Sequence, residues 1–165
     1  MARVIIDPRQ VADQRAVLNR DEAKHLRKVL RLREGDEVEA FDGQGWVYRA
    51  RIETLSSSQG TLFLLEKRMA SRGEKTGLIL CQALIKGDKM DFLVQKATEM
   101  GVSSIYVFTS SRSIPQWESS RVHLRLQRWK KISREACKQS GRNIFPEIYG
   151  VMGFHEALQE GGRGC

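Results

Sequence analysis

The stretch Gln82–Val102, QALIKGDKMDFLVQKATEMGV, reads as the end of a buried strand, a short polar loop and a helix. The helix is predicted because apolar residues recur at helical spacing, namely Met90, Leu93, Val94, Ala97 and Met100. Lys86 and Lys89 stand at its start, where the helix dipole disfavours cations. Either an anion binds there, or exposed lysines tolerate a cost of roughly a few tenths of a kcal/mol.

The residues around this stretch alternate between strand and helix patterns. The near-continuous apolar run LILCQALI at 78–85 is typical of a strand that is covered on both faces. SIYVFTS at 104–110 and PEIYGV at 146–151 predict two further strands, separated by a long helix that ends near Gly141. GFHEALQEG at 153–161 predicts a short last helix. This alternation predicts a parallel α/β unit with right-handed crossovers.

The first 70 residues contain short strand patterns and one helix pattern. RVIID at 3–7, WVYRARIE at 46–53 and TLFLLEK at 61–67 predict strands, and DGQGW at 42–46 predicts a tight turn. RDEAKHLRKVLRL at 20–32 predicts a helix that Asp21 caps. Its apolar stripe is expected to be Ala23, Leu26, Val29 and Leu30. Several short strands with tight turns predict a small β-barrel.

The predicted fold class is therefore α+β, with two domains. The expected boundaries are a β-barrel over 1–70, a polar and glycine-containing linker over 71–77, and an α/β domain over 78–165. No apolar run approaches the roughly 20 residues of a membrane span, so no membrane partner is expected. Three cysteines and three histidines are dispersed, which indicates neither a disulfide framework nor a metal site. A reducing, cytoplasmic setting is expected.

The net charge of +8 is concentrated in two blocks. Residues 1–33 carry nine Lys and Arg against four Asp and Glu, and residues 112–142 carry nine against two. The rest of the chain is mildly acidic. Two basic blocks on an acidic body indicate a polyanionic partner, most simply nucleic acid, although a merely basic surface has the same composition.

Three polar segments are candidates for a ligand site, because parallel sheets bind ligands beyond the carboxyl ends of their strands. They are IKGDK at 85–89, TSSRS at 109–113 and KQSGRN at 138–143, and we expect them to converge. Their cations are Lys86, Lys89, Arg112 and Arg142. These cations suit phosphates and a polar base edge. The alternative is that all three segments are solvated loops.

Three stretches together resemble the ribosomal RNA small subunit methyltransferase E family. They are HLRKVLRLREGD at 25–36, ALIKGDKMDFLVQKATEMGV at 83–102, and SRSIP at 111–115 with RWKKISREACKQSGRNIFPEI at 128–148. The resemblance implies a PUA-like β-barrel that binds RNA, followed by a SPOUT-class domain that is normally trefoil-knotted. It implies S-adenosylmethionine as methyl donor and N3 of a uridine in 16S ribosomal RNA of the small subunit as acceptor. It also implies a homodimer.

The resemblance implies roles for individual residues. Arg112, Glu135 and Arg142 would be catalytic. An arginine against the uracil oxygens would stabilise the charge that develops when N3 loses its proton. Glu135 could take this proton or orient Arg142, or otherwise be an ion-pair partner. The expected RNA-binding residues are Arg3, Lys24, His25, Arg27, Arg31, Lys86, Lys89, Gln139 and Ser140.

One part of the family pattern is absent from the sequence. The family forms its cofactor site in a knot with a G-P-E-G-G loop and an L-G-x-R-I-L-R segment, and neither occurs in these 165 residues. We therefore expect no cofactor-binding residue in this chain, a truncated SPOUT domain, and no activity of the chain alone. The alternative is a non-catalytic RNA-binding fragment.

Overall fold

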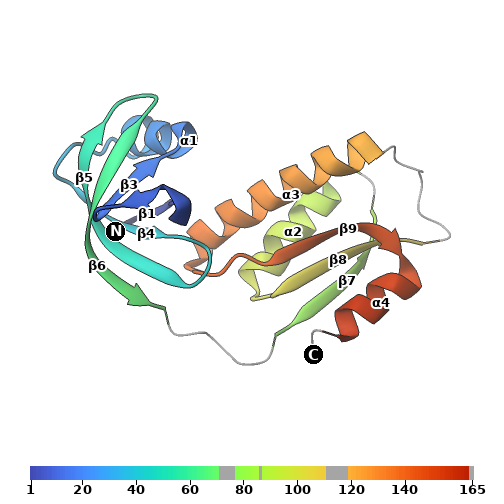
Figure 1. Cartoon of the computed structure of the whole chain (residues 1–165). Coiled ribbons are helices and arrows are strands. Elements are labelled where there is room, and N and C mark those ends of the chain that lie inside the picture. The colour runs from blue at the N-terminus through green and yellow to red at the C-terminus, as the bar shows by residue number, and fades with distance from the viewer. Residues whose placement is uncertain (71–76, 86, 111–118, 164–165) are drawn as a thin grey trace. The chain divides into compact units, whose positions relative to one another are not determined.

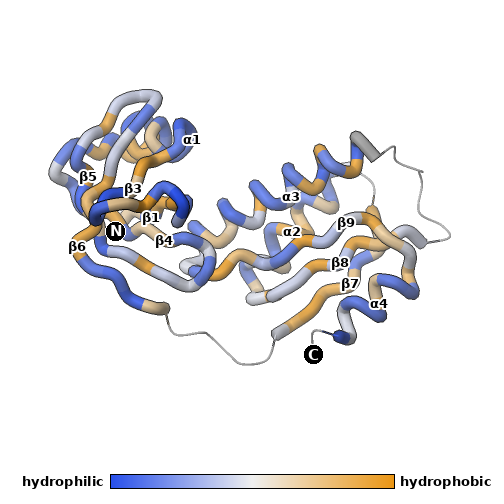
Figure 2. Tube along the Cα trace, in the orientation of Figure 1, coloured by the Kyte–Doolittle hydropathy of each residue, from blue (hydrophilic) through white to orange (hydrophobic). Residues whose placement is uncertain are grey.

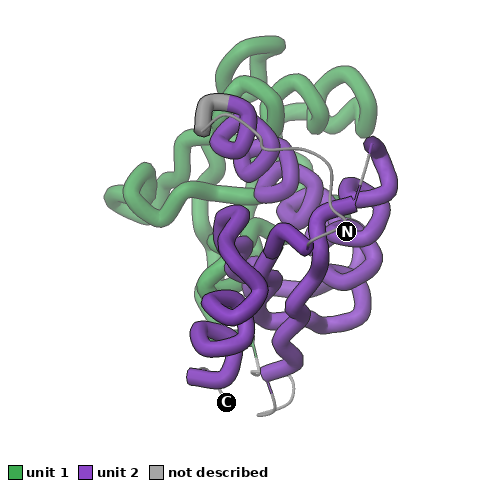
Figure 3. The backbone as a smooth tube through the Cα atoms, turned by 90° about the vertical axis from the view of Figure 1, so that its right-hand side faces the viewer, with its two compact units in different colours: residues 1–72 green, residues 73–165 purple. Residues whose placement is uncertain are grey.

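The computed structural model describes residues 1–70, 77–85, 87–110 and 119–163. The chain forms two compact units, residues 1–72 and 73–165, which Figure 3 shows in green and purple. Each unit has its own cluster of buried apolar side chains. None of the described helices is long and apolar enough to cross a bilayer.

Unit 1 is built on one mixed sheet (Figure 1). Its strands are β1 (Ala2–Ile5), β2 (Val11–Ala12), β3 (Arg15–Leu18), β4 (Glu37–Phe41), β5 (Trp46–Leu55) and β6 (Gly60–Met69). Its helical segments are η1 (Pro8–Gln10), α1 (Arg20–Lys24) and η2 (His25–Val29). The strand order is β1-β4-β5-β6-β3-β2, and every pair is antiparallel except β1 with β4. From Tyr48 onward β5 alternates buried and exposed residues, with Ala50 and Ile52 buried and Arg49 and Arg51 exposed.

The tight turn predicted at 42–46 is confirmed, and it joins β4 to β5. Asp42 Oδ1 accepts hydrogen bonds from Gln44 N at 2.8 Å and from Trp46 N at 3.1 Å. Gly43 and Gly45 have φ values of 75° and 105°, which a side chain would strain. The turn therefore depends on the two glycines and on one buried carboxylate.

The predicted closed barrel is not observed in the described part of unit 1. The strand pairings run from β1 to β2 without joining these two strands to each other. Strand β2 has two residues and pairs with β3. The strand patterns at 3–7, 46–53 and 61–67 are found as β1, β5 and β6, but closure depends on pairing between chain segments that no local pattern encodes.

Unit 2 is a three-stranded parallel sheet with helices on both faces (Figure 1). Its elements are β7 (Ile79–Ala83), α2 (Lys89–Glu99), β8 (Ser104–Thr109), α3 (Ser119–Ser140), β9 (Glu147–Gly153) and α4 (Phe154–Gly162). The strand order β7-β8-β9 follows the sequence, so right-handed crossovers place α2 and α3 on the same face. Helix α4 packs on the other face, where a Cβ on Gly161 would lie 3.2 Å from Cys81 Sγ. The predicted parallel α/β arrangement is confirmed.

The core of unit 2 lies between the sheet and the α2–α3 layer. Trp129 of α3 is 1% exposed and belongs to the same cluster as Met90 and Val94 of α2. Helix α3 alternates hydrophilic and hydrophobic residues along its length (Figure 2). One predicted member of the α2 stripe is wrong: Met100 is 78% exposed, because it caps the helix just before Gly101 ends it.

Candidate functional site

The helical segment of unit 1 begins at Asn19, not at the predicted Asp21. The Asn19 side chain accepts a hydrogen bond from Glu22 N at 2.9 Å. Ala23 and Leu26 are fully buried in the unit 1 core. Glu22 is also buried, and its Oε2 accepts from Ile5 N at 3.4 Å. The start of the segment is thus anchored to the sheet.

The chain then widens into η2, which moves two apolar residues to the surface. Leu30 N donates to His25 O at 3.1 Å, five residues back instead of the four of an α-helix. The extra residue rotates the side chains that follow out of α-helical register. Val29 and Leu30 are 65% and 40% exposed. The predicted apolar stripe is therefore wrong for these two residues.

Arg31 reverses the chain in a strained conformation. Its φ is 57°, a left-handed value that costs a residue with a Cβ about 1 kcal/mol or more. Leu32 N then donates to Leu26 O at 3.0 Å, and Leu32 packs against the unit 1 core. Leu26 and Leu32 thus anchor both ends of the short turn that carries Val29, Leu30 and Arg31. We call the whole segment, residues 20–33, the basic tip.

The basic tip carries exposed cations. They are Arg20, Lys24, Arg27, Lys28, Arg31 and Arg33. Within the part of the chain that the structure describes, none of them forms a salt bridge, and the Arg27 guanidinium donates only to Leu55 O at 3.4 Å. His25, predicted with them, is half-buried. The exposure of Val29 and Leu30 is not predicted by the helical spacing; the one signal in the sequence is that Leu26, Val29, Leu30 and Leu32 cannot all face one core.

Arg3, another predicted RNA-binding residue, is engaged inside unit 1. Its Nε lies 2.8 Å from Glu39 Oε1, and its guanidinium carbon lies 4.3 Å from the centre of the Phe41 ring. Its side chain is 14% exposed. This arrangement makes Arg3 part of the frame that joins β1 to β4.

Most cations of α3 have an interaction partner. Those with partners are Arg125, Arg128, Lys131, Arg134 and Lys138. Arg128 Nη2 lies 2.7 Å from Asp91 Oδ2, and Arg134 lies 5.5 Å from the centre of the Phe145 ring. Lys138 Nζ lies 3.2 Å from Glu135 Oε2, and the lysine side chain is 5% exposed. The second basic block therefore offers less free charge than its composition indicates.

A hollow of about 480 Å³ on α3 contains two of the predicted residues, Glu135 and Gln139. It is also lined by Gln95, Arg128, Lys131, Ile132 and Ala136. The carboxylate of Glu135 is held by Lys138 in the same helix. Ser140, next in the predicted set, donates its hydroxyl to Ala136 O at 2.7 Å and so bonds within α3.

Arg142 lies at the carboxyl end of α2, away from the carboxyl ends of β7 and β8. Its Nη1 donates to Thr98 O at 2.7 Å and to Val102 O at 2.9 Å. Both carbonyls precede β8, and Arg142 itself precedes β9, so it lies at the amino ends of the parallel strands. The expected convergence of the three polar segments is therefore wrong. Arg142 satisfies carbonyl groups that a helix end leaves open.

The lysines at the start of α2 raise the question of a bound anion. Lys86 lies outside the described residues, as does Arg112 of the TSSRS segment. Lys89 is the first residue of α2 and is exposed. Asp91 in the same turn supplies the negative charge that a helix start favours, and it also pairs with Arg128. The structure thus accommodates Lys89 without an anion.

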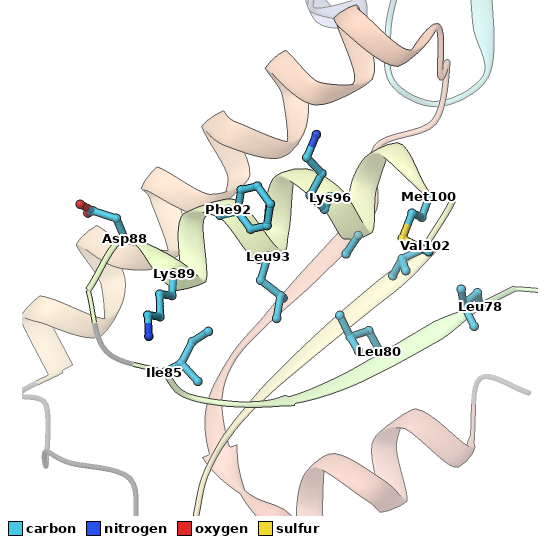
Figure 4. A pocket seen from close by; sticks show the side chains of 11 residues that line it. Leu78, Leu80, Ile85, Asp88, Lys89, Phe92, Leu93, Lys96, Met100 and Val102 are labelled. Carbon is cyan, nitrogen blue, oxygen red and sulfur yellow. The ribbon is translucent and has the colours of Figure 1, made fainter.

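A larger hollow of about 780 Å³ lies between α2 and the β7 side of the sheet. Figure 4 shows Leu80, Ile85 and Leu93 projecting into it. The charged groups of Asp88 and Lys96 point away from it in the same view. Lys96 Nζ donates to Glu99 Oε2 at 2.7 Å, and this hydrogen bond, with a second from Gln95, lowers the pKa of Glu99. The hollow is an apolar surface with a charged rim.

Comparison with known proteins places these features in a family. Residues 72–163 match the family model described as an RNA methyltransferase domain. The chain belongs to the RNA methyltransferase family. Residues 18–65, which include the basic tip, match the model of an RNA methyltransferase PUA domain. The PUA-like assignment of unit 1 therefore rests on the sequence match, independently of barrel closure.

Curated relatives and solved structures agree with the resemblance found in the sequence. The chain is 28% identical over 139 residues to the ribosomal RNA small subunit methyltransferase E of Bacillus subtilis, covering 84% of this chain and 54% of the relative. It is 31% identical over 129 residues to that of Buchnera aphidicola, covering 78% and 51%. The chain thus spans about half the length of the curated relatives it matches.

A crystal structure of the Neisseria gonorrhoeae ribosomal RNA small subunit methyltransferase E, bound to S-adenosyl methionine, superposes with a TM-score of 0.87. The two proteins are 32% identical, and the match covers 97% of this chain and 66% of the Neisseria chain. The predicted resemblance to the methyltransferase E family is confirmed by these matches.

The described hollows do not suit the cofactor of the Neisseria relative. S-adenosyl methionine has an adenine edge, ribose hydroxyls, an amino acid group and a sulfonium cation, and a binding site must satisfy each of them. The larger hollow presents apolar side chains, with Asp88, Lys89 and Lys96 as its charged residues. The smaller one presents Arg128 and Lys131 beside Glu135, whose carboxylate is already paired with Lys138, so this lining offers a sulfonium no free anionic partner. We assign the cofactor to neither hollow.

Proposed function

We propose that the protein acts in S-adenosylmethionine-dependent methylation of small-subunit ribosomal RNA, with N3 of a uridine in the 16S RNA as the acceptor. The proposal is supported by the family match and by the names of the relatives. The observation that carries it in this chain is the basic tip, whose exposed cations have no salt-bridge partners within the described residues. Unpaired cations of this kind bind the phosphates of a nucleic acid.

The basic tip would hold and orient the RNA. Each cation that contacts a phosphate releases a counterion, so binding is strong at low salt and non-specific in sequence. Lys24, Arg27, Lys28 and Arg31 are the residues assigned to this role, because their side chains are exposed and free to follow the RNA backbone. The substrate would also place the protein in the cytoplasm, where small subunits are assembled.

The three predicted catalytic residues differ in how well their surroundings suit a catalytic role. Glu135 remains a candidate to accept the proton of uridine N3, since its carboxylate is exposed in the hollow on α3. Arg142 is held on the carbonyls of Thr98 and Val102, which favours a structural role. Arg112 lies outside the described residues.

The test of this function is made on ribosomal RNA from cells. Deleting the gene should remove one N3-methyluridine from 16S RNA, which mass spectrometry of nuclease digests detects. Restoring the gene should restore the modification, and restoring it with Arg27→Ala and Arg31→Ala should restore less. An unchanged set of modified uridines after deletion would refute the proposal.

Two finer expectations stay predictions. The first is a homodimer, which light scattering of the purified chain checks. The second is that these 165 residues contribute no cofactor-binding residue, which calorimetric titration with S-adenosylmethionine checks by showing weak binding or none.

A further inference from the structure

Val29 and Leu30 form an exposed apolar pair among cations. They are 65% and 40% exposed, they are adjacent in sequence, and Lys28 and Arg31 flank them. Single apolar residues on a protein surface are ordinary. A consecutive pair, inside a segment where no cation has a salt bridge among the described residues, is not explained by packing within unit 1.

The backbone fixes this pair in its exposed position. Leu30 N is bonded to His25 O at 3.1 Å, and Leu32 N is bonded to Leu26 O at 3.0 Å. Leu26 is fully buried, so the loop is tied to the core. Arg31 has a φ of 57°, a conformation that glycine would adopt more easily, yet the position carries a cation. Widened helical turns and strained residues are found at functional sites.

The cationic and the aliphatic side chains of the basic tip would contact different parts of an RNA. The cations attract phosphates, which every RNA presents regardless of base pairing. Contact with a phosphate contributes no favourable binding free energy to an aliphatic side chain. Contact with the face of a base does, because it buries apolar surface. In an RNA duplex the base faces are stacked and the major groove is too narrow to enter, whereas loops and bulges present bases that are unstacked.

We propose that Val29 and Leu30 pack against an unstacked base of the RNA, while Lys28 and Arg31 bind the phosphates on either side of it. This inference rests on the proposed RNA-directed function and adds the form of RNA that the tip selects, a single-stranded loop instead of a duplex. Charge favours RNA over other partners, since six Lys and Arg lie within residues 20–33.

The test compares two probes with the full 165-residue chain. One probe is an RNA hairpin with a loop of unpaired uridines, and the other is a blunt duplex of the same stem. The Val29→Ser, Leu30→Ser double variant should bind the hairpin roughly tenfold more weakly, since the apolar surface that the two side chains bury against a base is lost. Its duplex affinity and the salt dependence of its binding should stay unchanged. Both residues are exposed, so circular dichroism should show an intact fold.

Controls separate this inference from the proposed function. Met69→Ser removes an equally exposed apolar side chain, 51% exposed at the carboxyl end of β6, and should leave hairpin binding unchanged. Equal hairpin affinity of the double variant and the parent would overturn the base contact alone. Failure of the parent chain to bind either RNA would overturn the proposed function. Loss of affinity for assembled subunits but not for the hairpin would overturn the base contact and assign the pair to a protein partner.

Discussion

The basic tip of unit 1 and helix α3 of unit 2 look alike in composition and differ in structure. The tip carries six Lys and Arg over 20–33, and none has a salt bridge within the described residues. In helix α3, Arg128 and Lys138 pair with Asp91 and Glu135, and Arg134 lies over the Phe145 ring. Net charge is therefore a poor guide to which surface meets a polyanion, because a cation with a close carboxylate partner contributes little field at a distance.

The largest effect is expected when charge is removed from each surface in turn. Arg27→Ala with Arg31→Ala should lower the slope of log affinity against log salt by about 2 units and weaken RNA binding roughly 10- to 100-fold near 0.1 M salt. The matched pair Arg128→Ala with Arg134→Ala removes the same charge from α3 and should change the slope by far less. Equal slopes for the two double variants would contradict the distinction.

The second prediction concerns Arg142, a cation that belongs to neither surface. Arg142→Ala should lower the stability of unit 2 by about 2 kcal/mol, since a charged donor to two carbonyls is lost. RNA affinity at a temperature where the variant is folded should be unchanged. Denaturant unfolding measures the first quantity and filter binding the second. A stable variant with weakened RNA binding would contradict the structural role and favour the predicted active-site role of Arg142.

The smallest effect is expected at Glu99, whose pKa is lowered by hydrogen bonds from Lys96 and then Gln95. A carboxyl with a lowered pKa in the folded state stabilises the protein above its ordinary pKa and loses this contribution as pH falls through the lowered value. Glu99→Gln should therefore reduce the melting temperature slightly near neutral pH, and the difference from the parent should vanish under acid. A difference that persists at low pH would assign the effect to packing.

Much of unit 2 could be predicted from the sequence, because its pattern is local. The apolar run at 78–85 and the spacing of Met90, Val94 and Ala97 predict the strand and the helix that are found. The predicted location of Arg142 is wrong, because nearness to a strand in sequence does not tell at which end of the strand a residue lies. KQSGRN precedes β9 and so lies at its amino end, opposite to the loops that follow β7 and β8.

The basic tip shows where local pattern fails. A helical reading places Val29 and Leu30 on the buried face with Leu26. A single wide turn, with the hydrogen bond from Leu30 N to His25 O, moves them to the surface. No glycine marks the reversal at Arg31, because an arginine occupies the left-handed position. The residues that carry the further inference are thus those whose exposure only the three-dimensional structure reveals.

The most direct test of the central claim is chemical footprinting of lysines with and without small-subunit ribosomal RNA. Lys24 and Lys28 in the basic tip and Lys131 on α3 are all exposed, so each is accessible to an acetylating reagent in the free chain. Mass spectrometry after brief acetylation should show that RNA protects Lys24 and Lys28 several-fold and leaves Lys131 nearly unchanged. Protection of Lys131 with continued labelling of Lys24 and Lys28 would contradict the account.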